Sequence, residues 1–278
     1  MTSPYQQPVP GAPLGTYTSP IPVRPATLGD AVASEWTKIR SVRSTMWTLG
    51  VLIVLVLGIG LLTVVAVNAS SADMKDTPVL SLGFYGVLLG SICVITLGVL
   101  TIASEYGTGM IRTTLTACPS RARILAAKSL VFFLLSFVIL LVTTGLVALL
   151  QSGMVTTGET PGGGEMFKAT VGVSLYVSTL GLLSLAIGAL IRHSAGAITV
   201  MIGVVLLPLV LALFMFAQSL DSVRQALFEY SIPSQLAVFY GASVSDSGPT
   251  GWTPLLILGA VTAAALGGAF ASLNSRDV

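Results

Sequence analysis

Charged residues are few in this chain, and four of them gather in one short segment, residues 104–123. The segment holds one acid, Glu105, and three arginines, of which Arg112 is the first. A charge at the edge of an apolar stretch is costly unless it is paired. Glu105 and Arg112 therefore suit ion pairing, either with each other or, for Arg112, with an acid on another protein.

Other kinds of chemistry find little support. The single histidine, His193, cannot build a metal site or a triad with other histidines, and we interpret it as an interfacial residue. Cys93 lies in an apolar run and Cys118 in a polar loop, so we expect neither a disulfide nor a metal site. No G-x-x-x-x-G-K-[ST] phosphate loop occurs. We therefore expect no enzyme activity, no cofactor and no nucleic-acid partner.

Long uncharged stretches separate the charged segments. The chain is 54% hydrophobic and only 9% charged, whereas soluble domains carry about a quarter charged residues. Six uncharged runs reach 23 residues or more, and a helix needs about 20 to cross a bilayer. The runs are apolar all round, which excludes barrel strands. The sequence predicts an all-α membrane protein with six transmembrane helices, at about residues 46–67, 80–103, 128–150, 169–191, 195–217 and 253–273.

Basic residues predict the orientation. With the N-terminus inside, 10 of the 13 Lys and Arg residues lie on the cytoplasmic side, and seven of the 11 acids lie outside. We therefore predict a multi-pass protein of the plasma membrane with both ends in the cytoplasm. Residues 1–26, with half of the 14 prolines, predict a disordered cytoplasmic tail. Residues 27–278 then form one transmembrane domain in contact with membrane lipids.

The middles of the predicted spans hold no ionisable residue. Such residues usually mark proton relays or intramembrane catalysis, so their absence argues against a proton-coupled transporter and an intramembrane protease. Sodium coupling through backbone carbonyls stays open. Transport against a gradient would otherwise draw its energy from another protein.

Two cytoplasmic segments carry more structure than linkers need. Thr27 and Asp30 have the spacing of a capping box before a basic amphipathic helix that ends near Arg43. Its apolar residues recur at helical spacing and suit the inner membrane surface: they are Leu28, Val32, Trp36, Ile39 and Val42. This helix either anchors the first span or relays motion from a cytoplasmic partner.

The second segment predicts a short helix between the second and third spans. Gly107 and Gly109 permit a sharp turn, and Met110–Ala117 then places Ile111 and Leu115 on one side and Arg112 in water. Pro119 interrupts the chain, and Ser120 can cap the next helix.

Three further features concern packing. Pro208 predicts a kink in the fifth span. Leu220, Val223, Leu227 and Tyr230 predict an amphipathic helix in the last outside loop. Gly86-x-x-x-Gly90 predicts close helix packing, within one chain or at a dimer seam.

These segments resemble a known family. Glu105-Tyr106-Gly107-Thr108-Gly109-Met110-Ile111-Arg112, with Leu115, Pro119-Ser120-Arg121 and Ala127-Lys128 after it, is similar to the cytoplasmic element of ABC-2 type ATP-binding-cassette permeases, especially small actinobacterial ones. Ser34–Ser41 and the terminal Arg276-Asp277 resemble that family more weakly. The resemblance covers about residues 28–278.

The resemblance implies an exporter subunit that forms a homo- or heterodimer and docks on a separate ABC ATPase. It implies a coupling element that touches the ATPase, made of Glu105, Tyr106, Gly107, Gly109, Arg112, Leu115, Pro119 and Arg121. It also implies a connecting helix with Glu35, Trp36, Lys38 and Arg40.

Two other functions stay open. The chain could be an accessory or sensory subunit that anchors a cytoplasmic partner without transporting anything. An intramembrane enzyme is a weaker alternative, because mid-span acids are missing and there is one histidine. Apolar spans do not choose among lipids, hydrophobic drugs, peptides and ions as substrates.

Overall fold

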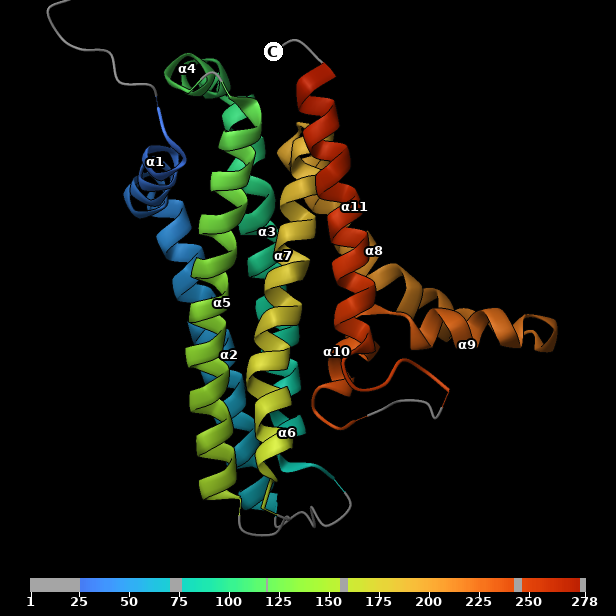
Figure 1. Ribbon diagram of the computed structural model, residues 1–278. Helices are drawn as coiled ribbons and strands as arrows, with labels where there is room; N and C mark the ends of the chain where they lie inside the picture. Colours follow the sequence, from blue (N-terminus) through green and yellow to red (C-terminus); the bar gives the residue numbers. More distant parts are fainter. Residues whose placement is uncertain (1–25, 71–76, 119, 156–159, 243–246, 276–278) are drawn as a thin grey trace, which may run out of the picture.

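The computed structural model describes residues 26–70, 77–118, 120–155, 160–242 and 247–275, and every regular element in these ranges is a helix (Figure 1). The fold class predicted from the sequence, all-α, is therefore confirmed for this part of the chain. The predicted disordered tail lies outside the described residues, except for Ala26, and so do Pro119, Arg276 and Asp277.

Six helices in the described ranges are long and apolar enough to cross a membrane, as predicted. They are α2 (Arg43–Ser70), η1 with α3 (Val79–Gly83 and Phe84–Gly107), α5 (Arg121–Met154), α6 with η2 and α7 (Gly163–Phe167, Lys168–Gly172 and Val173–Ile191), α8 (Ser194–Phe214) and α11 (Thr253–Ser275). Long runs of Val, Leu and Ile give these helices a high mean hydropathy. In hydrocarbon, a helix satisfies the backbone hydrogen bonds of such a run within the run itself.

The helices and the predicted spans differ by a few residues at several ends, and two of these differences have a clear cause. The fifth span was expected to reach residue 217, but α8 ends at Phe214 because Met215 turns to an extended backbone conformation. The third span was expected from about residue 128, and α5 starts at Arg121, directly after the predicted cap Ser120. Three of the first eight residues of α5 are basic, and an uncharged run cannot detect a helix that begins with charges.

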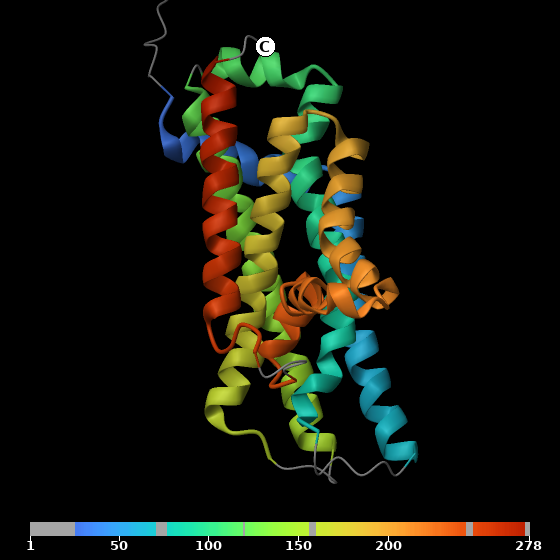
Figure 2. The same cartoon turned by 90° about the vertical axis from the view of Figure 1, so that its right-hand side faces the viewer.

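Five shorter helices complete the described chain. They are α1 (Leu28–Ser41), α4 (Met110–Ala117), η3 (Gln218–Leu220), α9 (Asp221–Glu229) and α10 (Ile232–Val238). In Figures 1 and 2, α1 and α4 lie crosswise at the same end of the bundle, close to the last turns of α11. We name this the α4 end and the opposite one the α6 end.

The centre of the bundle is the contact between α3 and α7, the two most buried long helices. Small residues allow it, since a side chain on Gly98 of α3 would clash with the Gly181 carbonyl and with Ser184 of α7. Gly86 likewise faces the backbone of α2 at Val56, with 3.0 Å between an added Cβ and the carbonyl oxygen. The Gly86-x-x-x-Gly90 pattern therefore serves packing within this chain.

The outside of the bundle is apolar. Val54, Leu62, Leu149 and Leu256 are each more than 60% exposed. Exposed aliphatic side chains on the long helices suit a surface that contacts lipid.

Helix α9 leaves the bundle sideways beyond α8 (Figures 1 and 2). It forms where the spacing predicted an amphipathic helix, and Leu220, Val223 and Tyr230 are exposed along it. Pro208 lies inside α8, and the kink expected there stays a prediction.

Candidate functional site

The site begins with the local signals that start α1. Thr27 caps the helix, and Asp30 Oδ2 accepts hydrogen bonds from both the backbone N–H and the hydroxyl of Thr27. The predicted capping box is therefore present. It fixes the first turn of α1, and the helix then runs for 14 residues.

Helix α1 turns Glu35 toward the bundle and leaves several apolar side chains exposed. Glu35 is the one buried residue in the helix, whereas Leu28, Trp36 and Val42 are exposed. Arg40 is exposed as well. For a helix at a membrane surface this arrangement places apolar side chains toward lipid and a carboxylate toward the protein.

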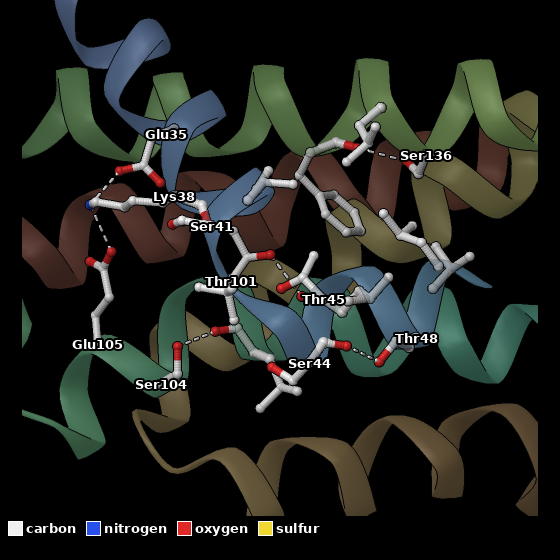
Figure 3. A pocket seen from close by; sticks show the side chains of 18 of the residues that line it. Glu35, Lys38, Ser41, Ser44, Thr45, Thr48, Thr101, Ser104, Glu105 and Ser136 are labelled. Atoms are coloured by element: carbon white, nitrogen blue, oxygen red, sulfur yellow. Dashed lines mark hydrogen bonds and ion pairs between the residues drawn. The ribbon is translucent and has the colours of Figure 1, made fainter. Parts of the chain in front are cut away.

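Glu35 belongs to a closed ring of four charged side chains, which we call the quartet: Glu35, Lys38, Glu105 and Lys128. Lys38 Nζ lies 2.8 Å from Glu35 Oε1 and 2.9 Å from Glu105 Oε1. Lys128 Nζ lies 2.8 Å from Glu35 Oε2 and 2.6 Å from Glu105 Oε1. Each ammonium group thus bridges both carboxylates, and the ring joins α1, α3 and α5 (Figure 3 shows the part around Lys38).

The quartet has no net charge, which is what allows it to be buried. Lys128 is 1% exposed and the two carboxylates 6% each. An unpaired charge at such depth would cost several kcal/mol. Burial alone would lower the pKa of Lys38, but hydrogen bonds and the charges of Glu35 and Glu105 outweigh it and raise that pKa. Lys38 therefore keeps its charge at physiological pH.

Beside the quartet, α3 gives way to α4 through a glycine turn. Gly107 is the last residue of α3, and Gly109 has φ +73°, a left-handed conformation that favours glycine. Helix α4 then covers Met110–Ala117, as predicted. Ile111 is buried, Leu115 is half-buried and Arg112 is exposed, so the predicted faces are confirmed too.

Three further cations hold the loops of the α4 end. Arg121 donates to the Leu273 carbonyl of α11, and Arg123 donates to the carbonyl of Ala26 before α1. The Arg192 guanidinium lies 5.0 Å from the centre of the Tyr106 ring, a cation–π contact. Ser120 caps α5 by accepting from the Arg123 N–H at 3.4 Å, as expected.

Glu105 and Arg112 were expected to pair with each other or, for Arg112, with an acid on another protein. The ion pairs of Glu105 within the described chain run to Lys38 and Lys128. Arg112 is exposed on α4 and makes no ion pair with another described residue. The predicted pairing of Arg112 with Glu105 is therefore not observed, and its contact with another protein stays a prediction.

The structure brings together residues that were predicted in separate groups. Glu35 and Lys38 were expected on a connecting helix and Glu105 in a coupling loop, yet they share one ring. Lys128 was not predicted as a site residue, although it served to predict orientation and ended the motif that resembles ABC-2 permeases. A second signal was its place, directly before 30 uncharged residues.

A cavity of about 380 Å³ adjoins the quartet between α1, α2, α3 and α5. Glu35, Lys38 and Glu105 line it at the α4 end, and aliphatic side chains such as Leu52 and Val94 line it deeper in the bundle. Between them lie several hydroxyl groups, which Figure 3 shows around the space.

Six candidate spans and two crosswise helices tied to one end define a polytopic helical membrane protein. Residues 31–219, more than half of the chain, match the family model described as ABC-2 family transporter protein. The chain therefore belongs to the ABC-2 family of transporter membrane proteins. No curated protein matches it.

The match includes all four quartet residues, all of α4, and α1 from Ala31 onward. The predicted resemblance to ABC-2 permeases is thus confirmed, and its actinobacterial part stays a prediction.

Proposed function

We propose that the chain is the transmembrane subunit of an ATP-driven ABC exporter and that the segment 104–123 receives force from a separate ATPase subunit. The observation that carries this proposal is the position of α4. It lies crosswise at the end of the bundle (Figure 2). Its residue Ile111 is buried, whereas Arg112, Thr113 and Thr116 are exposed. A helix with one packed and one free face suits contact with a partner.

The quartet can transmit a displacement of α4 to helices inside the bundle. A push on α4 acts on the end of α3, where Glu105 is bound to Lys38 of α1 and Lys128 of α5. Buried charges in a closed ring cannot separate without a large cost, so the three helices move together. Force on one short helix thereby reaches two of the candidate spans and the crosswise α1.

Charge supports a cytoplasmic α4 end. Eight described Lys and Arg residues lie at the α4 end: Lys38, Arg40, Arg43, Arg112, Arg121, Arg123, Lys128 and Arg192. Two, Lys168 and Arg224, lie toward the α6 end. An excess of basic residues marks the cytoplasmic side. We therefore propose cytoplasmic termini in the plasma membrane, and a dimer of permease subunits whose partner is a second copy or a related chain.

The experiment is the substitution Arg112→Glu in the chain copurified with a candidate ATPase that carries a phosphate loop and an ABC signature. Reversing an exposed charge at a docking surface removes an attraction and adds a repulsion. We expect at least a tenfold fall in ATPase association or in chain-dependent ATP hydrolysis, with normal membrane insertion. Insertion is checked by the amount of protein in extracted membranes.

Lys168→Glu is the matched control, because Lys168 carries the same charge toward the opposite end. It should leave association and hydrolysis unchanged. Full association and hydrolysis in Arg112→Glu would contradict docking through α4. Association without any effect of the chain on hydrolysis would favour the accessory-subunit alternative.

A further inference from the structure

The cavity beside the quartet has the size and the lining of a site for a small ligand. Its volume, about 380 Å³, lies in the range of small-molecule sites, about 300–1,000 Å³. The deeper half is aliphatic and aromatic, with Leu97 and Phe132 among the lining residues. An apolar body is therefore favoured there, since its burial removes apolar surface from water.

Four hydroxyl groups of the wall can act only as acceptors, whereas Ser44 and Thr45, which also line it, donate to no described residue. Thr48, Thr101, Ser104 and Ser136 each donate their one proton to a carbonyl of their own helix, to Ser44, Leu97, Leu100 and Phe132 respectively. A hydroxyl whose proton is engaged keeps two lone pairs for other donors. These four oxygens come from three helices that surround the cavity (Figure 3).

The charged part of the wall has no spare donor, so its carboxylates decide which charge of ligand the cavity favours. Lys38 Nζ has three protons, and its three partners are Glu35, Glu105 and, at 3.5 Å, Thr114 Oγ1. By contrast, Glu105 Oε2 is buried and has no hydrogen-bond partner in the described chain. The lining thus holds two carboxylates against one ammonium, and Lys128 does not line the cavity.

We propose that this cavity binds an amphiphile with a protonated amine head and an apolar tail. The head lies among the hydroxyl oxygens near Glu105, and the tail lies between Leu52, Leu97 and Phe132. An anionic head would find acceptors and carboxylates in its way, and a neutral alcohol would lack the charge. The site lies within one chain, between α1, α2, α3 and α5.

The test uses the full chain in phosphatidylcholine nanodiscs with a photoreactive probe, decylammonium that carries a diazirine in its tail. We expect labelling on α3 and α5 near Leu97 and Phe132. Unlabelled decylammonium should compete, decanol should compete at least tenfold more weakly, and decyl sulfate should not compete.

Two variants and one control connect the labelling to the cavity. Thr101→Val keeps the shape but removes an acceptor, and the loss of a hydrogen bond to a charged group weakens binding about tenfold. Thr96→Val is the control, since Thr96 makes the same type of bond, to Ile92 O, on the same helix but does not line the cavity. Thr48→Phe fills the space and should abolish labelling.

Adding phosphatidylethanolamine to the nanodisc distinguishes the source of the amine. Competition by this lipid supports a lipid headgroup, and its absence supports a soluble amphiphile; both keep the ligand class. Equal competition by decanol, stronger competition by decyl sulfate, or an equal effect of Thr96→Val and Thr101→Val would overturn the proposal. The test needs no ATPase, so its failure would not affect the proposed role of α4.

Discussion

Among single residues, Lys128 is the charged side chain on which the quartet depends most. It is the most buried member of the quartet, and it contacts both carboxylates of the ring. Its Nζ also lies 3.4 Å from the Thr101 carbonyl. No other described lysine is enclosed in this way, because Lys38 is 29% exposed.

Replacing Lys128 with Met keeps much of the side-chain length and removes the charge. Glu35 and Glu105 then share one ammonium group, and a buried charge is left without full compensation. Breaking a buried ion pair in this manner costs about 3–5 kcal/mol. We expect Lys128→Met to lower the free energy of unfolding by that amount, measured by denaturant unfolding in detergent micelles.

Lys168→Met is the control, because Lys168 is half-buried and has no ion-pair partner in the described chain. It should change stability by less than about 1 kcal/mol. A double-mutant cycle with Glu35→Gln should show strong coupling to Lys128. Additive effects of the two substitutions would contradict a closed ring.

Among elements, α3 and α7 approach each other closely because Gly98 has no side chain at their contact. Gly98 leaves room for the Gly181 carbonyl and Ser184 Oγ, both of which occupy the place of a Cβ. Because backbone atoms of α7 form one side of this contact, a larger residue at position 98 cannot be accommodated by a rotamer change alone.

Gly98→Leu should therefore destabilise the bundle. Overpacking costs about 1–3 kcal/mol and sometimes more, and we expect a lower thermal unfolding midpoint in detergent. Gly145→Leu tests the same change in α5, where an added Cβ meets no atom within 4 Å. A similar fall in both variants would contradict a specific role for the close α3–α7 contact.

How much the sequence predicts also differs between elements. The six spans follow from uncharged runs because lipid excludes charge, and α4 follows from Gly109 and the proline after it. The uncharged run of the third span begins only after Lys128, whereas α5 starts at Arg121, where the predicted Ser120 cap and not the uncharged run marks its first turn. Charge patterns predict where lipid ends but not where a helix begins.

The quartet could not be predicted because its members are far apart in the chain. Glu105 is 67 residues from Lys38, and Lys128 is 93 residues from Glu35. Their meeting depends on how α1, α3 and α5 rotate about their axes, which a single sequence does not specify. The cavity beside them depends on the same rotations.

At the scale of the whole molecule, the proposed coupling requires that the α4 end faces the cytoplasm. The quartet, α4 and most basic residues lie there, and an ATPase can reach α4 only from that side. The two ends can be told apart by one exposed residue at each, Thr116 on α4 and Gly164 on α6.

The most direct measurement is the reaction of single cysteines with a membrane-impermeant maleimide, after Cys93 and Cys118 are replaced by alanine. We predict that Gly164→Cys reacts in intact cells and that Thr116→Cys reacts only after the cells are permeabilised. Labelling of Thr116→Cys in intact cells would place α4 outside and contradict the proposed coupling to an ATPase.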